Sequence, residues 1–159
     1  MMSDGEIGVR LAHLDLLNRY CHALDTRDFV LLAGLFEEDV VFEARMLTHD
    51  GPPDPNAVRI EGAAALVGAL TTIWSNLSAT HHMITNHVMD IAADRGMVTG
   101  SCYIRAYHLG RGDKSHLFEE SLGRFDFQTV RIVSEWKIRR WSENIMIMLG
   151  AREVFGQRA

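Results

Sequence analysis

The chain has 159 residues, which is enough for one domain with a substantial hydrophobic core, and we expect a single domain over residues 1–159. Its composition, 47% hydrophobic and 23% charged, is typical of a globular protein and excludes an intrinsically disordered chain. A formal net charge of −5 gives the protein no overall attraction to nucleic acid or to an anionic membrane, so we expect neither as a partner.

The first half of the chain is predicted to be mainly helical. Ser3-Asp4-Gly5-Glu6 is typical of a capping box, in which the Ser and Glu side chains satisfy free amides at a helix start. Apolar residues at helical spacing then predict three helices, over about residues 4–23, 31–36 and 62–74. The acidic run 37–39 is expected to end the second helix, before a strand over residues 40–44. Three prolines, at positions 52, 53 and 55, predict a loop over residues 48–56.

The second half is predicted to consist of β-strands. Stretches rich in β-forming residues, with turn signals at 94–96 and 110–114, predict strands over residues 82–91, 97–109, 117–129 and 135–149. Helices followed by a run of antiparallel strands indicate an α+β fold. The helices can cover one face of a curved sheet, which leaves an apolar interior where a small ligand would bind.

The sequence carries no targeting signal that we recognise. The N-terminal residues lack the apolar segment of a secretory signal, and no run approaches the roughly 18 apolar residues of a membrane-spanning helix. Cys21 and Cys102 are too few for a disulfide framework and suit a reducing compartment. We therefore expect a soluble, cytoplasmic protein.

Asp25 and a cluster of histidines are the first candidates for chemistry. Asp25 follows the first predicted helix, where a carboxylate is also common as a simple turn residue. In the strand after the third helix, alternation places His82, Ile84, Asn86 and Val88 on one face and His81, Met83, Thr85 and His87 on the other. These histidine spacings do not match common pairs of metal ligands, so we expect no metal site.

The later strands carry further polar candidates. On the strand over 97–109, His108 shares a face with Ile104 and Ala106, and Tyr103 lies on the opposite face. The spacing leaves open whether His108 enters a pocket or lies at an edge. The strand carboxylates are expected to be solvated or paired across strands; they are Glu119, Glu120 and Asp126.

Short motifs along the chain resemble the SnoaL-like branch of the NTF2-like superfamily. They are Tyr20-x4-Asp25-x2-Asp28-Phe29, Leu35-Phe36-x2-Asp39, Gly62, Thr80-x-His82-x3-Asn86 and Trp136-Lys137-Ile138. Their order covers residues 7–150 and is similar to scytalone dehydratase, the bile-acid 7α-dehydratases and hexachlorocyclohexane dehydrochlorinase. The resemblance implies an NTF2-like cone, with N-terminal helices packed on a strongly curved mixed or antiparallel sheet around an apolar pocket. This fold hosts many reactions, so it does not by itself define one.

The resemblance also implies roles for individual residues. The related enzymes share an Asp–His dyad, onto which Asp25 and His82 fall, and scytalone dehydratase has a second His where this chain has His108. Bile-acid dehydratases have a Tyr five residues before the Asp, which matches Tyr20. Leu24 and Ala44 stand where scytalone dehydratase has tyrosines, so scytalone itself is not the expected substrate. Substrate contacts are expected from Asn144, Tyr103, Asn86 and Leu24.

The implied function is a cofactor-independent lyase of the dehydratase type, acting on a small cyclic hydroxy-carbonyl compound. In this scheme His82 is the general base, Asp25 fixes its tautomer, Tyr20 polarises the carbonyl or positions the substrate, and His108 protonates the leaving hydroxyl. Two alternatives stay open. One is a proton-transfer enzyme like ketosteroid isomerase or a polyketide cyclase. The other is a non-catalytic scaffold like the β-subunit of ring-hydroxylating dioxygenases, in which Asp25 and His82 need not meet. A homo-oligomer, dimer or trimer, is expected because relatives pack their sheets face to face.

Overall fold

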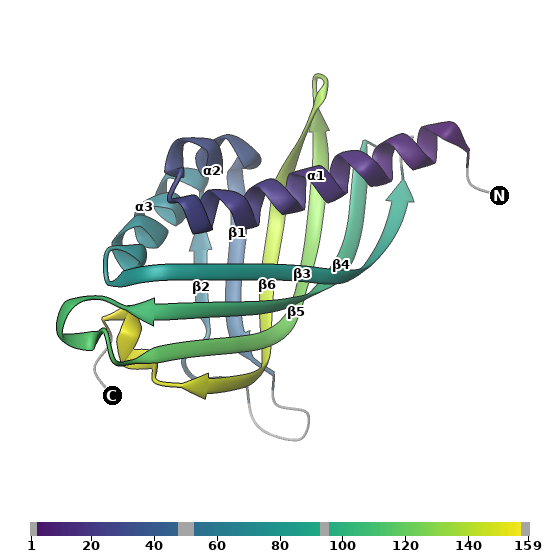
Figure 1. Ribbon diagram of the computed structural model, residues 1–159. Coiled ribbons are helices and arrows are strands. Elements are labelled where there is room, and N and C mark those ends of the chain that lie inside the picture. Colours follow the sequence, from purple (N-terminus) through teal and green to yellow (C-terminus); the bar gives the residue numbers. More distant parts are fainter. Residues whose placement is uncertain (1–2, 48–52, 93–95, 157–159) are drawn as a thin grey trace.

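The computed structural model describes residues 3–47, 53–92 and 96–156, in which three helices lie on one side of a six-stranded mixed sheet (Figure 1). The helices are α1 (Asp4–Thr26), α2 (Phe29–Leu35) and α3 (Ala63–Trp74). The strands are β1 (Phe36–Met46), β2 (Val58–Glu61), β3 (Leu77–Ala92), β4 (Met97–Gly110), β5 (Phe118–Ile132) and β6 (Glu135–Gly150). The α+β cone that the sequence predicts is confirmed.

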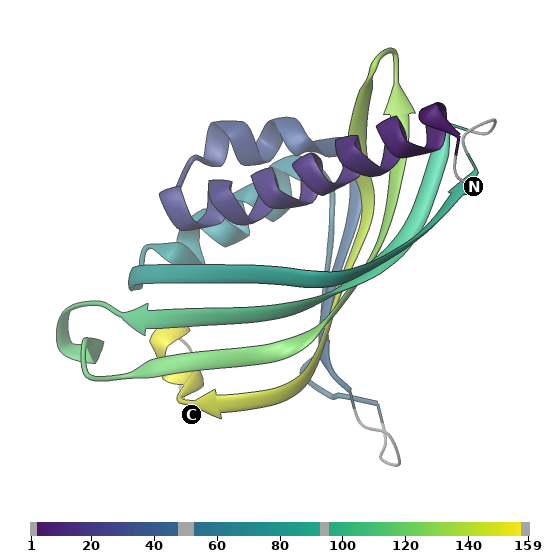
Figure 2. The same cartoon turned by 45° about the vertical axis from the view of Figure 1, so that its right-hand side comes forward.

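The sheet is open and strongly bent. Its strand order is β2-β1-β6-β5-β4-β3, with β1 parallel to β6 and every other neighbouring pair antiparallel. Figure 2 shows the long strands β3 to β6 curving so that the sheet folds part of the way around the helices. The side chains on the inner face therefore converge on the helix layer, and those on the outer face point away from it.

Helix α1 begins at the predicted capping box and ends later than its sequence predicts. The Ser3 hydroxyl accepts a hydrogen bond from the Glu6 amide at 3.3 Å, and the Glu6 carboxylate accepts one from the Ser3 amide at 2.7 Å, which confirms the capping box. The helix continues three residues past the predicted end, to Thr26. Arg27 then takes a left-handed conformation (φ 58°) and donates to the Leu77 carbonyl at 2.9 Å. Asp25 consequently belongs to the last helical turn.

Two elements of the first half differ from the sequence prediction. The acidic run Glu37–Asp39 lies inside strand β1 and does not end a helix, because Phe36 is already extended and Arg139 of β6 pairs with Glu37 at 2.6 Å. Strand β2 was not predicted, since four residues with mostly exposed side chains give no periodic signal. Pro53 and Pro55 lie between these strands as predicted, whereas residues 48–52 of the loop and 94–95 of the turn lie outside the described residues.

The core fills the space between the helices and the inner face of the sheet. Trp141 is fully buried, with its ring 4.6 Å from the centroids of both Tyr20 and Phe125. Leu17 and Leu24 continue the buried stripe of α1. This packing fixes the C-terminal end of α1 against the sheet. None of the described helices is both long and apolar enough to cross a membrane.

Candidate active site

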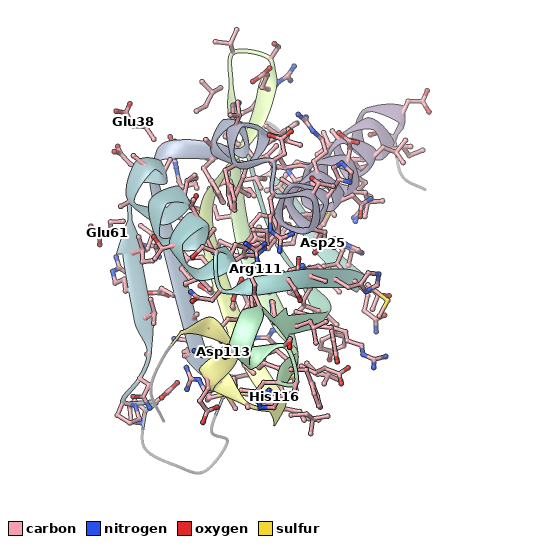
Figure 3. The ribbon with its side chains drawn as sticks, turned by 60° about the vertical axis from the view of Figure 1, so that its left-hand side comes forward. Asp25, Glu38, Glu61, Arg111, Asp113 and His116 are labelled. Atoms are coloured by element: carbon pink, nitrogen blue, oxygen red, sulfur yellow. The ribbon has the colours of Figure 1, made fainter. Side chains whose placement is uncertain are left out.

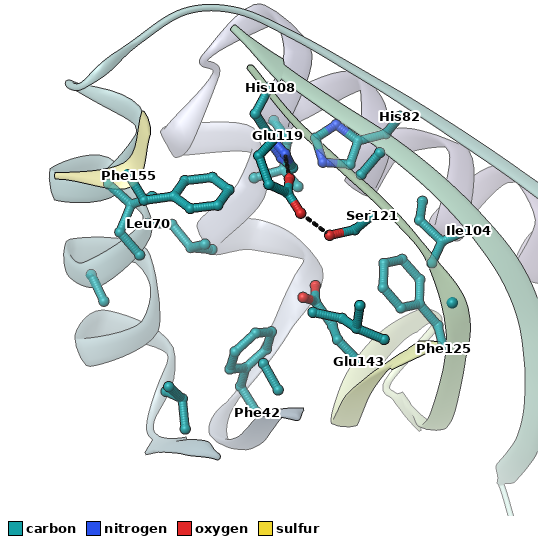
Figure 4. A pocket seen from close by; sticks show the side chains of 18 of the residues that line it. Phe42, Leu70, His82, Ile104, His108, Glu119, Ser121, Phe125, Glu143 and Phe155 are labelled. Carbon is teal, nitrogen blue, oxygen red and sulfur yellow. Dashed lines mark hydrogen bonds and ion pairs between the residues drawn. The ribbon is translucent and has the colours of Figure 1, made fainter. Parts of the chain in front are cut away.

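A cavity of about 180 Å³ lies inside the cone, between α3, the last 3-10 turn η3 (Arg152–Phe155) and the inner face of the sheet. Its lining is mainly apolar, with Phe42, Leu70, Trp74, Ile104, Phe125 and Phe155 among the contributors. Polar residues interrupt this lining: Figure 4 labels His82, His108, Glu119, Ser121 and Glu143, and Asn144 and Arg152 also contribute. A small enclosed space with few polar groups is typical of a site for a small organic ligand.

His82 lines this cavity and forms a hydrogen-bonded pair with Asp25, which lies behind it and borders a surface groove. His82 Nδ1 lies 2.6 Å from Asp25 Oδ1, and the side chain of His82 is only 4% exposed. Asp25 also accepts hydrogen bonds from the Thr80 hydroxyl at 2.8 Å and from the His82 amide at 2.9 Å. The carboxylate therefore requires a proton on Nδ1, which leaves Nε2 of a neutral imidazole as the acceptor.

The chain around the pair holds it in place. Figure 3 shows Asp25 at the C-terminal end of α1, next to β3. The indole of Trp74 donates to the Leu24 carbonyl at 3.0 Å and thereby ties this end of α1 to α3. The same indole lies parallel to the His82 ring, with 6.0 Å between centroids and 14° between planes. The end of α1 thus positions Asp25, β3 positions His82, and α3 positions Trp74 against the His82 ring. These contacts give the Asp25–His82 pair a fixed geometry.

Burial and hydrogen bonding shift both pKa values of the pair. Burial lowers the pKa of His82, and the hydrogen bond to Asp25 only partly opposes this effect. Burial alone would raise the pKa of Asp25, but hydrogen bonds and charge from His82, together with the Thr80 hydroxyl, bring it below its ordinary value. At neutral pH the pair is therefore a carboxylate and a neutral imidazole, the state that a general base needs.

A second histidine–carboxylate pair faces the first. His108 Nδ1 lies 2.6 Å from Oε2 of Glu119, its direct partner across β4 and β5, and Glu119 is fully buried. The Ser121 hydroxyl donates to the other carboxylate oxygen of Glu119. The rings of His82 and His108 are 5.3 Å apart and nearly perpendicular. The cavity therefore presents two imidazoles, each with its Nδ1 bonded to a carboxylate.

Tyr20 and Glu143 form a third polar pair. Glu143 of β6 lines the cavity, and the buried hydroxyl of Tyr20 donates to its Oε1 at 3.3 Å. Tyr20 itself does not line the cavity, so the prediction that it touches the substrate carbonyl is not supported by its position. It lies behind Glu143 and positions that carboxyl group.

A β-bulge explains why Asn86 does not reach the cavity. The register of β3 against β4 shifts between Thr85 and Val88, where Asn86 has a left-handed backbone (φ 54°). The extra residue inverts the alternation that follows, so that Val88 is 67% exposed and Met89 is buried. The expected common face of His82, Asn86 and Val88 is therefore wrong. Asn86 is exposed and accepts a hydrogen bond from the Thr85 hydroxyl.

Two other expected substrate contacts point away from the cavity. Tyr103 is 45% exposed on the outer face of β4, because Ile104 is its inward neighbour, and it lines the surface groove that Asp25 and His82 also border. Asn144 contributes to the cavity lining, but its side chain accepts from Arg45 at 2.9 Å and donates to Asp126 at 2.7 Å, both on the outer face. Leu24, by contrast, lines the cavity.

Sequence reasoning missed Glu119 and Glu143 as cavity residues. Glu119 was expected to be solvated or paired across strands, and it is paired, but inside the cavity. Its direct position opposite His108 was the signal that could have identified it, had the register of β4 and β5 been known. Glu143 is the sequence neighbour of Asn144 and lines the cavity, and no face was assigned to either residue from the sequence. Within residues 3–47, 53–92 and 96–156, no three His, Cys, Asp or Glu side chains are grouped to hold a metal ion.

Comparisons with known proteins identify the domain family of this chain and solved structures with the same fold. The model of the SnoaL-like domain matches residues 6–142. A candidate aromatic ring hydroxylase from Novosphingobium aromaticivorans superimposes with a TM-score of 0.76 and 25% identity, over 94% of this chain and 97% of that one. A candidate scytalone dehydratase from the same organism gives 0.80 and 20%, over 99% and 95%. Hexachlorocyclohexane dehydrochlorinase LinA-type3 from Novosphingobium barchaimii gives 0.71 and 14%, over 92% of each chain. The curated proteins contain no match.

Proposed function

The chain belongs to the SnoaL-like domain family, and we propose that it is a cofactor-independent lyase of the dehydratase type, acting on a small cyclic hydroxy-carbonyl compound. The observation that carries this proposal is the 2.6 Å contact between Asp25 and Nδ1 of His82, a histidine that lines a mainly apolar cavity. A scaffold subunit would have no need of this contact. Buried, hydrogen-bonded pairs of this kind are how proteins prepare a histidine for proton abstraction.

The proposed reaction uses the two imidazoles in sequence. Nε2 of His82 removes a proton from the carbon next to the substrate carbonyl, and the electron pair of the broken C–H bond moves toward the carbonyl oxygen. The C–O bond to the β-hydroxyl then breaks, and a proton from His108 lets that oxygen leave as water. The Asp25 carboxylate stabilises the imidazolium that His82 becomes. The Glu119 carboxylate, 2.6 Å from His108 Nδ1, offsets the positive charge that His108 carries as a proton donor.

The size of the cavity supports a substrate with a single ring. A dry engineered cavity of roughly 150 Å³ accommodates benzene. The cavity of about 180 Å³ is close to this volume, so it matches one six-membered ring with small polar substituents. A four-ring steroid is much larger, and this difference favours a small-ring substrate over the steroid isomerase alternative.

The test is a screen of single-ring β-hydroxy ketones, in which loss of water is followed by the ultraviolet absorbance of the enone product. We expect turnover by the parent protein and a drop of roughly 10²- to 10⁴-fold in kcat/KM for His82→Ala, the usual worth of a general base. His81→Ala is the matched control, because His81 precedes His82 on the same strand but is exposed. It should retain the parent rate.

Three outcomes contradict the proposal. Equal turnover by the parent and His82→Ala would show that His82 is not the general base. Isomerisation without loss of water assigns the site to the proton-transfer alternative. A parent protein that converts no member of the panel refutes the dehydratase assignment for single-ring hydroxy ketones.

A further inference from the structure

Glu143 is a carboxyl group for which the proposed reaction has no role. It projects from the inner face of β6 into the cavity, and in Figure 4 its carboxyl group lies below Glu119 and Ser121, with His82 and His108 at the top of the view. It therefore borders the space that a substrate ring would occupy, across from the proposed base.

The surroundings of Glu143 offer no positive charge at contact distance. Among the described residues its hydrogen-bond partner is the Tyr20 hydroxyl, which contacts only Oε1, and none of the ion pairs includes it. The titratable or charged groups that face it come from five elements: Tyr20 and Cys21 from α1, His82 from β3, His108 from β4, Glu119 from β5 and Arg152 from η3. A carboxylate here would be both desolvated and close to a second carboxylate.

The neutral acid is the less costly form of this group. Partial burial raises the pKa of Glu143 to about 7, and the Glu119 carboxylate adds to the increase, while the hydrogen bond from Tyr20 opposes it. Because Tyr20 donates to Oε1, a proton on Oε2 is free to point at a ligand in the cavity. Two carboxyl groups in one site, held in different environments, are often an acid and an anion with separate tasks.

We propose that Glu143 is a further catalytic residue, which donates a hydrogen bond from its neutral carboxyl group to the carbonyl oxygen of the substrate. This inference rests on the proposed function. When His82 removes the α-proton, negative charge collects on that oxygen, and the bond from Glu143 becomes stronger at the moment it is needed. The proton stays on Glu143 throughout, so His82 and His108 remain the only groups that exchange protons with the substrate. Tyr20 acts behind it as a positioning residue.

The test measures binding and needs no turnover. The probe is 3-methylcyclohex-2-enone, a neutral single-ring ketone, titrated by calorimetry against the parent, Glu143→Gln and Glu143→Leu at pH 6 and pH 9. One net hydrogen bond changes affinity by roughly 2- to 12-fold. We expect the parent to lose about this factor between pH 6 and pH 9, as the donor ionises. Glu143→Gln keeps a donor without an ionisable proton, so its affinity should not change with pH, and Glu143→Leu should bind weakly at both.

Infrared spectroscopy gives a second readout. The carbonyl stretch of the bound enone should lie at lower frequency in the parent at pH 6 than in Glu143→Leu. Glu61→Gln is the control, because Glu61 is exposed on the edge strand β2 and should behave like the parent. The inference is overturned if the parent does not bind the enone, if its affinity is the same at both pH values, or if Glu143→Leu matches it in affinity and frequency.

Turnover then separates this inference from the proposed function. On a substrate that the parent dehydrates, Glu143→Leu should lower kcat by roughly 10²- to 10³-fold, the usual effect of removing one donor to a developing oxyanion. If His82→Ala abolishes turnover but Glu143→Leu does not reduce it, the proposed function stands and the role of Glu143 fails. If the enone binds with the expected pH dependence but His82→Ala turns over like the parent, the donor stands and the proposed function fails.

Discussion

Replacing Asp25 with Asn tests the candidate site most directly, because three donors converge on this carboxylate. Oδ1 accepts from the Thr80 hydroxyl and from His82 Nδ1, and Oδ2 accepts from the His82 amide. Asparagine offers an oxygen on one side only and an NH₂ group on the other. If its oxygen faces Nδ1, its NH₂ group opposes the backbone amide of His82. If it turns the other way, its NH₂ group donates to Nδ1, and the imidazole must carry its proton on Nε2.

Both arrangements have a predictable cost. Leaving the His82 amide without an acceptor costs about 1–3 kcal/mol of stability. For a domain of this size that corresponds to a fall of about 2–4 °C in Tm for each kcal/mol. The other arrangement preserves more stability but places a proton on the nitrogen that should act as the base. Loss of the correct tautomer lowers kcat by about 10⁴-fold in a well-studied triad, so we expect a loss of at least about 10³-fold here.

The assay combines thermal unfolding, turnover and ¹⁵N NMR of the histidine side chains, which distinguishes the two tautomers. Asp28→Asn is the matched control: Asp28 caps α2 through the Leu31 amide at 2.8 Å, and asparagine is an equally good cap. An Asp25→Asn protein with the parent Tm, a proton on His82 Nδ1 and parent turnover would refute the assignment of Asp25 as the residue that orients His82.

Three further predictions follow from the packing of the cavity. Burial raises the pKa of Glu143 from 4.5 to about 7, so its ionisation in the folded state reduces the stability of the parent as the pH rises through this window. In urea unfolding, the stability of Glu143→Gln relative to the parent should increase by about 2–3 kcal/mol between pH 5 and pH 8. A difference that stays constant with pH would contradict the raised pKa of Glu143. Ala106 lines the cavity, so Ala106→Leu should fill part of it and weaken the binding of cyclic ketones at least tenfold in calorimetric titrations. Ala79 is exposed, so Ala79→Leu should leave this affinity unchanged. Equal affinity of both variants would show that the ligand binds elsewhere. Trp74→Phe leaves the Leu24 carbonyl without its indole donor and should cost about 1–3 kcal/mol by chemical denaturation, and a loss below about 0.5 kcal/mol would show that this bond does not hold α1.

Much of the fold could be predicted because its signals are local. The capping box at Ser3, the apolar spacing of the three helices and the long β-rich stretches each depend on residues a few positions apart. Strand β2 could not be predicted, because its four residues are held by pairing with β1 and carry little pattern of their own. Element ends shifted by a few residues for a similar reason: the extension of β1 to Phe36 depends on its partner strand β6.

In the candidate site, too, some residues could be identified from the sequence, whereas others depended on the pairing of the strands. Asp25 and His82 were identified through a family resemblance, and the structure brings them into contact, although their spacing of 57 residues alone said nothing about proximity. The polar residues that complete the cavity depended on strand parity. A single bulge at Asn86 moves every later side chain of β3 to the other face.

The sequence by itself determined the fold class, the order of the helices and of every described strand except β2, and the pair of residues most suited to proton transfer. Only the tertiary structure decided which carboxylates accompany them. The side chains of Glu119 and Glu143 face the cavity, whereas the Asn144 side chain bonds to Asp126 on the outer face, because sheet register, bulges and curvature set the direction of each side chain. These features are fixed by contacts between strands, and such contacts leave no signature within any one strand.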